Sequence, residues 1–226
     1  MNTVVIAGAS GVVGARVLHH LLRRDDDVAR VIVLGRRILP LQHEKLVSKV
    51  VDLQNTAAVA AEIPEGTAVA FCCLGTTMKR AGSMDAFRAV DHDAVLAFGQ
   101  AALAKGARRF LLTSSVGARA GSANFYQRTK GEVEDALARL GYAQLTILRP
   151  SLIDDEGARR DYRAGERLVL PLARFVFAVI GRTRRYAPIS ADVIAKAMIH
   201  LAFDNTTDRV RRVESDELHR LGGSTQ

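Results

Sequence analysis

Three residues in the middle of the chain have the types and spacing of an acid–base catalyst. Ser115 follows a short apolar run, and Tyr126 and Lys130 lie four residues apart in a segment with helical periodicity. That spacing places both side chains on one helical face, a turn apart. A lysine ammonium stabilises a neighbouring phenolate, so such a tyrosine can exchange a proton with a substrate. A serine at this strand end, Ser114 or Ser115, would orient a carbonyl or hydroxyl group. A surface Tyr–Lys pair is the alternative.

Glycines near the N-terminus could hold a phosphate group. Gly8, Gly11 and Gly14 directly follow the first expected strand and open the first expected helix. Residues without Cβ allow a tight turn, close approach of the backbone to a pyrophosphate, and packing of helix against strand. The helix N-terminus offers free N–H groups to the phosphates. An ordinary glycine-rich turn is the alternative. The cofactor-binding residues expected here are Gly8, Ser10, Gly11, Val12, Val13 and Gly14.

The end of the second expected strand bears on the choice between NAD and NADP. An acidic residue at this position would bind the ribose 2′-hydroxyl of NAD. The chain has Gly35-Arg36-Arg37 instead. A guanidinium can bind a 2′-phosphate through two hydrogen bonds and can stack on adenine. We therefore expect NADPH as the cofactor, bound by Arg36 and Arg37. A solvated arginine pair in a basic protein is the alternative.

Short β-branched runs alternate with helical segments over the first 150 residues. This strict alternation predicts the α/β class, with a Rossmann-type, doubly wound parallel sheet and right-handed crossovers. A dinucleotide would bind across the carboxyl ends of its strands. The expected strands are residues 3–6, 31–34, 47–51, 69–74, 110–113 and 145–148, and the expected helices are residues 12–24, 84–104 and 127–140.

The pattern changes after Pro150. Residues 154–166 are charged and read as a loop. We expect an apolar helix at residues 168–180, a short strand at 186–189 and a helix at 191–203. The last 20 residues are polar, and we expect little structure there. This part is too small for an independent core. We therefore expect one domain over residues 1–226, with a cofactor-binding core at 1–150 and a small C-terminal substrate lid and tail at 151–226.

Composition narrows the classes of partner. The formal charge of +8 could attract nucleic acid, anionic lipid or phosphorylated ligands. The arginine clusters, of which Arg211-Arg212 is one, are short and carry no nucleic-acid motif, so we expect a solvated surface and no nucleic-acid partner. The six histidines show no metal-ligand spacing, and no zinc is implied. Cys72 and Cys73 are adjacent on a strand and point to opposite faces, so we expect reduced core residues.

Two segments bear on membranes and location. The N-terminus enters a strand without a basic region and hydrophobic signal core, so we expect a cytoplasmic protein. The apolar segment Leu168–Ile180 has 13 residues and contains Pro171 and Arg174, whereas a membrane span needs about 20 apolar residues. We expect it to be a lid or a subunit contact.

Three further motifs carry a family resemblance: residues 71–77 (FCCLGTT), residues 130–134 (KGEVE) and Arg149-Pro150-Ser151. With the glycine pattern, the serine and the Tyr-x-x-x-Lys pair, they make the chain similar to the short-chain dehydrogenase/reductase superfamily. More narrowly, residues 1 to about 203 resemble the Tat-interacting-protein-like group of its atypical members. The resemblance implies NADPH binding by the glycine loop and the Arg36 region. It also implies catalytic roles for Ser115, Tyr126 and Lys130, and backbone contact of Pro150 with the nicotinamide.

Two more strand ends fit such a cofactor. Short-chain dehydrogenases place an acid after the third strand, near the adenine amino group, and Asp52 stands there, although it could equally cap a turn. After the fourth strand, small residues would let the backbone run along the cofactor. Lys130 can also hold the nicotinamide ribose. The contacts expected at the two strand ends are Asp52, Leu53, Leu74, Gly75, Thr76 and Thr77.

Two functions follow from these residues. The first is an NADPH-dependent oxidoreductase that reduces a small carbonyl or related substrate, with Tyr126 as proton donor and Ser115 as second donor. The second is an NADPH-binding regulator or sensor that acts through protein partners without turnover. The mammalian member of the resembling group is discussed as such a regulator. The expected partners are a small-molecule substrate and a homodimer or protein partner.

Overall fold

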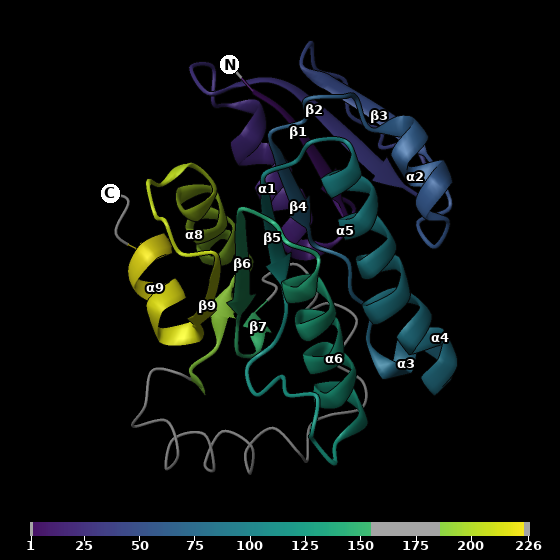
Figure 1. The fold of residues 1–226 in the computed structure, drawn as a ribbon. Helices are drawn as coiled ribbons and strands as arrows, with labels where there is room; N and C mark the ends of the chain where they lie inside the picture. The colour runs from purple at the N-terminus through teal and green to yellow at the C-terminus, as the bar shows by residue number, and fades with distance from the viewer. Residues whose placement is uncertain (1, 155–185, 224–226) are drawn as a thin grey trace.

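The computed structural model describes residues 2–154 and 186–223, and one parallel sheet of seven strands forms its centre (Figure 1). The strand order is β3-β2-β1-β4-β5-β6-β9, so the chain winds outward in both directions from β1. The expected Rossmann-type α/β class is confirmed. The strands are β1 (Asn2–Ala7), β2 (Val28–Gly35), β3 (Leu46–Val50), β4 (Val69–Cys72), β5 (Arg109–Thr113), β6 (Gln144–Arg149) and β9 (Val210–Glu214).

Helices cover both faces of this sheet (Figure 1). The central strands are therefore buried on both faces, and they read as continuous apolar runs; in β1, residues 4–7 have no exposed surface. One face is covered by α1 (Val12–Leu22), α8 (Ala191–Phe203) and α9 (Ser215–Gly223). The other face is covered by α2 (Thr56–Glu62), α5 (Ala94–Ala104) and α6 (Phe125–Arg139).

The helix expected at residues 84–104 has the expected ends but an irregular middle. It consists of α4 (Met84–Arg88), the π-helical turn η1 (Ala89–Asp93) and α5. The wider π turn changes which side chains face the core, and such turns are frequent at functional sites. Two helices within the first 150 residues were not expected, α2 and the short α3 (Met78–Ala81). Both begin after a side-chain cap, which a short helix needs more than apolar periodicity.

The expectation of little structure in the last 20 residues is wrong. β9 pairs in parallel with β6 and becomes the seventh strand, and α9 packs against α8. The strand has only two apolar residues among five, because it is an edge strand whose arginines are paired. Arg211 contacts Asp204 and Glu217, and Arg212 contacts Glu134. Residues 191–223 thus belong to the layered core.

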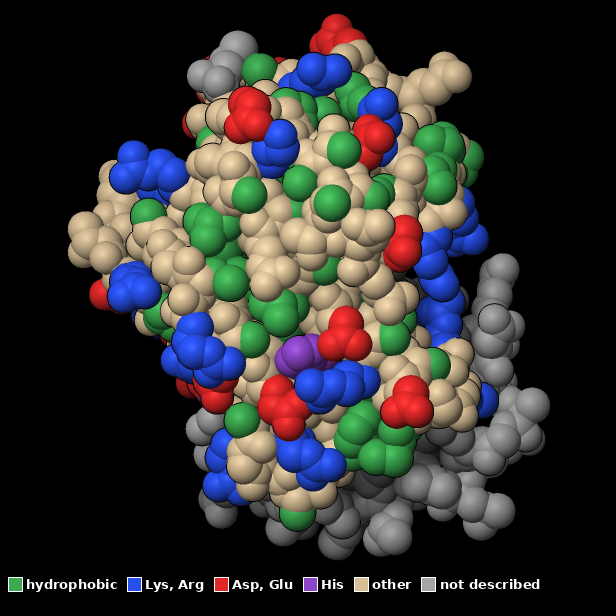
Figure 2. Space-filling view, turned by 45° about the vertical axis from the view of Figure 1, so that its right-hand side comes forward, with side chains coloured by type: hydrophobic (Ala, Val, Ile, Leu, Met, Phe, Trp, Pro, Cys, Tyr) green, Lys and Arg blue, Asp and Glu red, His purple; other side chains and the backbone are tan. Residues whose placement is uncertain are grey.

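The remaining segments after Pro150 differ in detail. The strand expected at 186–189 is β8 (Ile189–Ser190), which pairs only with β7 (Ile153–Asp154). The loop expected at 154–166 lies almost wholly, and the apolar helix at 168–180 entirely, outside the described residues. Of the proposed lid and tail, residues 151–154 and 186–223 are described. In the described ranges, none of the helices combines the length and the apolar character that crossing a membrane requires. On the face in Figure 2, basic and acidic side chains are interspersed.

Candidate functional site

The glycine loop connects β1 to α1, and its three glycines do different things. Gly8 has φ +87°, and a Cβ there would lie 2.4 Å from the Cys73 carbonyl oxygen on the neighbouring strand end. At Gly14 a Cβ would lie 2.2 Å from the carbonyl oxygen of Gly8. At Gly11 the nearest atom would be 3.3 Å away, and the backbone is extended with φ −85°. The fold therefore requires Gly8 and Gly14, whereas Gly11 is exposed over the helix end and a Cβ there would meet the Gly8 carbonyl oxygen in a tight contact.

The exposed start of α1 suits an anion. Ser10, Gly11 and Val12 are exposed at the start of α1, whose first turn has no acidic residue and no side-chain cap. The Gly11 N–H donates to the Gly8 carbonyl oxygen at 3.0 Å, but the other N–H groups of the first turn and the positive end of the helix dipole favour a phosphate there. The side chain of Val13 and the whole of Gly14 are buried in the core. Of these two predicted contacts, Val13 can face a ligand only through its backbone, and Gly14 serves the packing of the loop.

Arg36 and Arg37 are both exposed just beyond β2. Residues 36–45, all of them described, connect β2 to β3 without a helix. A hollow of about 830 Å³ lies between this connection and α1, and Ser10 and Arg37 both line it. The structure therefore brings the phosphate loop and Arg37 to one cavity, whereas Arg36 does not line it.

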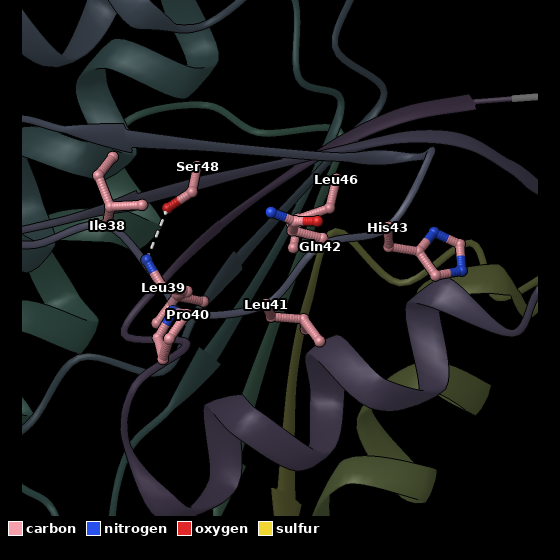
Figure 3. Close-up of a pocket in the computed structure, with 8 residues that line it drawn as sticks. All are labelled: Ile38, Leu39, Pro40, Leu41, Gln42, His43, Leu46 and Ser48. Atoms are coloured by element: carbon pink, nitrogen blue, oxygen red, sulfur yellow. Dashed lines mark hydrogen bonds between the residues drawn. The ribbon is translucent and has the colours of Figure 1, made fainter.

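A second hollow, of about 550 Å³, lies along the same β2–β3 connection (Figure 3). Ile38, Pro40 and Leu41 contribute to its wall, and the Leu39 N–H donates to Ser48 Oγ at 3.2 Å beside it. None of Ser115, Tyr126 and Lys130 lines either hollow. Both belong to the adenosine end of the predicted cofactor path.

The ends of β3 and β4 supply fewer free groups than expected. Asp52 Oδ1 accepts a hydrogen bond from the Gln54 N–H at 3.0 Å, so its side chain caps a turn, although it remains exposed. Thr77 caps α3 in the same way. Leu53 and Leu74 are buried in the core on the α5 side of the sheet. Gly75, in contrast, is exposed at the end of β4.

The start of α6 positions Tyr126. Asn124 caps the helix by accepting from the Gln127 N–H at 3.1 Å, which places Tyr126 in the first turn. The Tyr126 ring packs at 5.5 Å, centroid to centroid, against Phe87 of α4. Phe87 has no exposed surface, so the tyrosine has a fixed wall on one side while remaining partly exposed.

Lys130 lies one turn further along α6 and forms a buried ion pair that the sequence analysis missed. Its Nζ is 2.7 Å from Asp91 Oδ1 in η1, and the two side chains are 5% and 1% exposed. Burial is the largest single effect and lowers the pKa of Lys130, but Asp91, Tyr126 and Cys72 together raise it by more, and the net pKa lies above the usual value. A Cβ on Gly75 would lie 3.7 Å from Lys130 Nζ. The ammonium therefore lies directly beneath the exposed end of β4.

The two serines after β5 have different surroundings. Ser114 Oγ donates to Glu134 Oε1 at 2.5 Å, and both side chains are buried. Glu134 is also paired with Arg149, so Ser114 belongs to a structural network. Ser115 is partly exposed at the strand edge. This contrast favours Ser115 over Ser114 as the substrate-facing serine.

Backbone contacts hold the Ser115 loop against α6 and β6. The Val116 N–H donates to the Pro150 carbonyl oxygen at 2.9 Å, so that predicted nicotinamide contact already has a partner in the fold. The Arg119 N–H donates to the Gln127 carbonyl oxygen at 3.0 Å. A Cβ on Gly131 would lie 2.2 Å from backbone atoms of this loop, which explains the glycine that follows Lys130.

Asp91 and Glu134 are the residues that the sequence analysis did not assign to the site. Asp91 is four residues after the buried Phe87, a spacing that places a charge on an otherwise apolar helical face. That unusual position was the available signal. Glu134 was noticed only within the KGEVE motif, and nothing local predicts that Ser114 and Arg149 meet it.

The strand order, the glycine loop and the groups along the strand ends together define a Rossmann-type dinucleotide-binding protein. The model of a family described as NAD(P)H-binding matches residues 8–203. The chain belongs to this family, as an atypical short-chain dehydrogenase/reductase related to the proteins HTATIP2 and FMP52.

Two curated relatives illustrate this relationship. The protein HTATIP2 of Rattus norvegicus is 37% identical over 168 residues, which cover 73% of this chain and 67% of that protein. The mitochondrial protein FMP52 of Eremothecium gossypii is 29% identical over 221 residues, covering 98% of this chain and 97% of that protein. The expected cytoplasmic location of this chain stays a prediction.

A solved structure supports the fold. An oxidoreductase of the short-chain dehydrogenase/reductase family from Burkholderia thailandensis superposes with a TM-score of 0.67 at 19% identity. The match covers 96% of this chain and 92% of that one. At this identity, the likeness concerns the fold alone.

Proposed function

We propose that this protein is an NADPH-dependent reductase of a small carbonyl compound, with Tyr126 as proton donor. One observation carries the proposal: Lys130 shares a face of α6 with Tyr126 and lies beneath the exposed Gly75 at the strand edge. A buried cation within one turn of a partly exposed phenol is the arrangement that acid catalysis by tyrosine needs.

The residues present fit a dinucleotide with a 2′-phosphate. Ser10 and Val12 would hold the pyrophosphate through backbone N–H groups, and Gly11, whose N–H donates to the Gly8 carbonyl oxygen, would let it approach closely. Arg36 and Arg37 would take the 2′-phosphate, since no carboxylate stands at the end of β2. Lys130 would hold the nicotinamide ribose. When bound, the dinucleotide supplies a hydride.

Side chains of this protein would transfer the proton that the reduction needs. Tyr126 donates its phenolic proton to the substrate oxygen as negative charge develops there, so the carbonyl becomes an alcohol. The Ser115 hydroxyl donates a hydrogen bond to the same oxygen. Lys130 stabilises the tyrosinate that remains, and a proton from solvent restores the phenol.

A screen of small aldehydes and ketones with the purified protein, following NADPH absorbance, tests this function. We expect turnover with at least one carbonyl class and a preference for NADPH over NADH. If NADPH binds tightly but no carbonyl in a broad screen is reduced, the reductase proposal is wrong. The regulator that binds NADPH without turnover then becomes the better account.

A further inference from the structure

Asp91 is the buried group that the proposed reaction does not yet use. It lies in η1, the single π-helical turn between α4 and α5, and this turn packs against α6. A buried carboxylate is costly unless an opposite charge and hydrogen bonds compensate it. At Asp91 both compensations come from residues already assigned to the cofactor path.

The two carboxylate oxygens of Asp91 contact different parts of that path. Oδ1 lies 2.7 Å from Lys130 Nζ on α6. Oδ2 accepts a hydrogen bond from the Thr76 N–H, at 2.8 Å, in the loop after β4. Gly75 runs directly over the pair, because a Cβ there would lie 3.5 Å from Asp91 Oδ1. One side chain therefore joins the cation to the exposed backbone beside it.

We propose that Asp91 is a positioning residue that keeps the Lys130 ammonium charged and fixed beneath the β4 loop, where it serves the nicotinamide ribose and Tyr126. This inference rests on the proposed function for the role of Lys130, and it extends that function to a residue 39 positions away in the sequence. A second consequence is that the loop carrying Gly75 and Thr76 is held in register with the cation.

The groups that face Lys130 are few. Tyr126 comes from its own helix, Asp91 from η1 and Cys72 from β4. Burial raises the pKa of the Cys72 thiol to about 12, so it stays neutral at ordinary pH. In the described part of the chain, this leaves Asp91 as the anion that compensates the ammonium. Without that anion, only Tyr126 and Cys72 would oppose the effect of burial, and the pKa of the Lys130 ammonium would fall.

Asp91→Asn is the most direct test, because asparagine keeps the size and one acceptor oxygen and removes the charge. The readout is NADPH affinity, by fluorescence titration, between about pH 7 and about pH 9.5. The wild type should change less than about twofold, because its Lys130 stays charged throughout. Asp91→Asn should lose affinity by at least about tenfold across this range, as the lysine loses its proton.

Two variants serve as controls. Asp93→Asn removes the same charge from the same turn, but Asp93 is half exposed and paired with His92, so its pH profile should match the wild type. Lys130→Met should bind NADPH more weakly at every pH, with a flat profile. The double variant Asp91→Asn/Lys130→Met should match Lys130→Met, because Asp91 acts through the lysine.

Stability of the protein without cofactor gives an independent readout. Asp91→Asn should have a lower Tm than the double variant, which leaves no unpaired buried charge. If Asp91→Asn does not fold, the double variant decides: affinity equal to that of Lys130→Met supports the proposal, and further loss overturns it. A flat pH profile for folded Asp91→Asn also overturns it. These binding data need no turnover, so a protein that reduces no carbonyl would refute the reductase function and still decide the role of Asp91.

Discussion

At the phosphate loop, the groups available to a ligand are backbone N–H groups of exposed residues, whereas at α6 they depend on side chains that are almost fully buried. Gly11 can be approached because nothing covers it. The side chains of Lys130 and Asp91 are fixed because they are buried and form an ion pair. The phosphate loop needs only its own local backbone conformation to bind a phosphate. The site at α6 needs three elements, η1, α6 and the end of β4, to meet.

This difference implies that the two ends fail differently when they are changed. Binding of a phosphate by the loop backbone should be blocked by a larger side chain at the loop, even when that side chain carries no charge. Side-chain recognition should respond to the removal of a proton or a charge, with little effect on binding at the far end.

The largest expected effect is at the phosphate loop. Gly11→Val should lose some stability to the tight contact of its Cβ with the Gly8 carbonyl oxygen at 3.3 Å, but it should remain folded, since the backbone there is extended. Its side chain would occupy the path of the pyrophosphate. NADPH affinity should fall by at least about 10³-fold, or about 4 kcal/mol. Gly14→Val is the matched contrast and should fail to fold, because its Cβ would clash with the Gly8 carbonyl oxygen. Thermal shift with and without NADPH checks both variants. Undiminished stabilisation of Gly11→Val by NADPH would remove the phosphate loop from this position.

The next largest effects are expected at the two adjacent serines, Ser114 and Ser115. Ser115→Ala should lower turnover by about 10²-fold while leaving the Tm almost unchanged, since it removes one donor to the developing charge. Ser114→Ala should do the reverse and cost about 1–3 kcal/mol of unfolding free energy, because Glu134 loses a buried donor. Turnover assays and thermal unfolding of both variants decide the assignment. If Ser114→Ala impairs turnover more than Ser115→Ala, the substrate-facing serine has been misassigned.

The smallest effect concerns cofactor choice. NADPH should bind at least about tenfold more tightly than NADH, a gap of about 1.4 kcal/mol. Arg36→Ala should narrow that gap because it removes a partner of the 2′-phosphate. Arg30→Ala is the control, since Arg30 is also exposed on β2 but lies toward the start of the strand. Fluorescence titrations with both cofactors measure the gap. Equal wild-type affinities for the two would argue against a 2′-phosphate site.

Local patterns made the phosphate end and most of the sheet predictable from sequence. The glycine spacing lies within seven residues, and buried strands appear as apolar runs. The Asp91–Lys130 pair could not be found this way. Its members are far apart in sequence, and the polar run Asp91-His92-Asp93 resembles a solvated turn until the π-helical geometry turns Asp91 inward. β9 was missed for a related reason, since its arginines are paired with acids outside the strand, Asp204, Glu217 and Glu134.

The central claim is that the phosphate loop binds the cofactor, while Tyr126 at the start of α6 supplies the proton. Turnover and NADPH affinity of Tyr126→Phe, measured together, test it most directly. Phenylalanine keeps the ring packing against Phe87 and removes only the hydroxyl. Turnover on an accepted carbonyl should fall by about 10²–10⁴-fold, with NADPH affinity within about twofold of the wild type. Wild-type turnover in Tyr126→Phe would contradict the account.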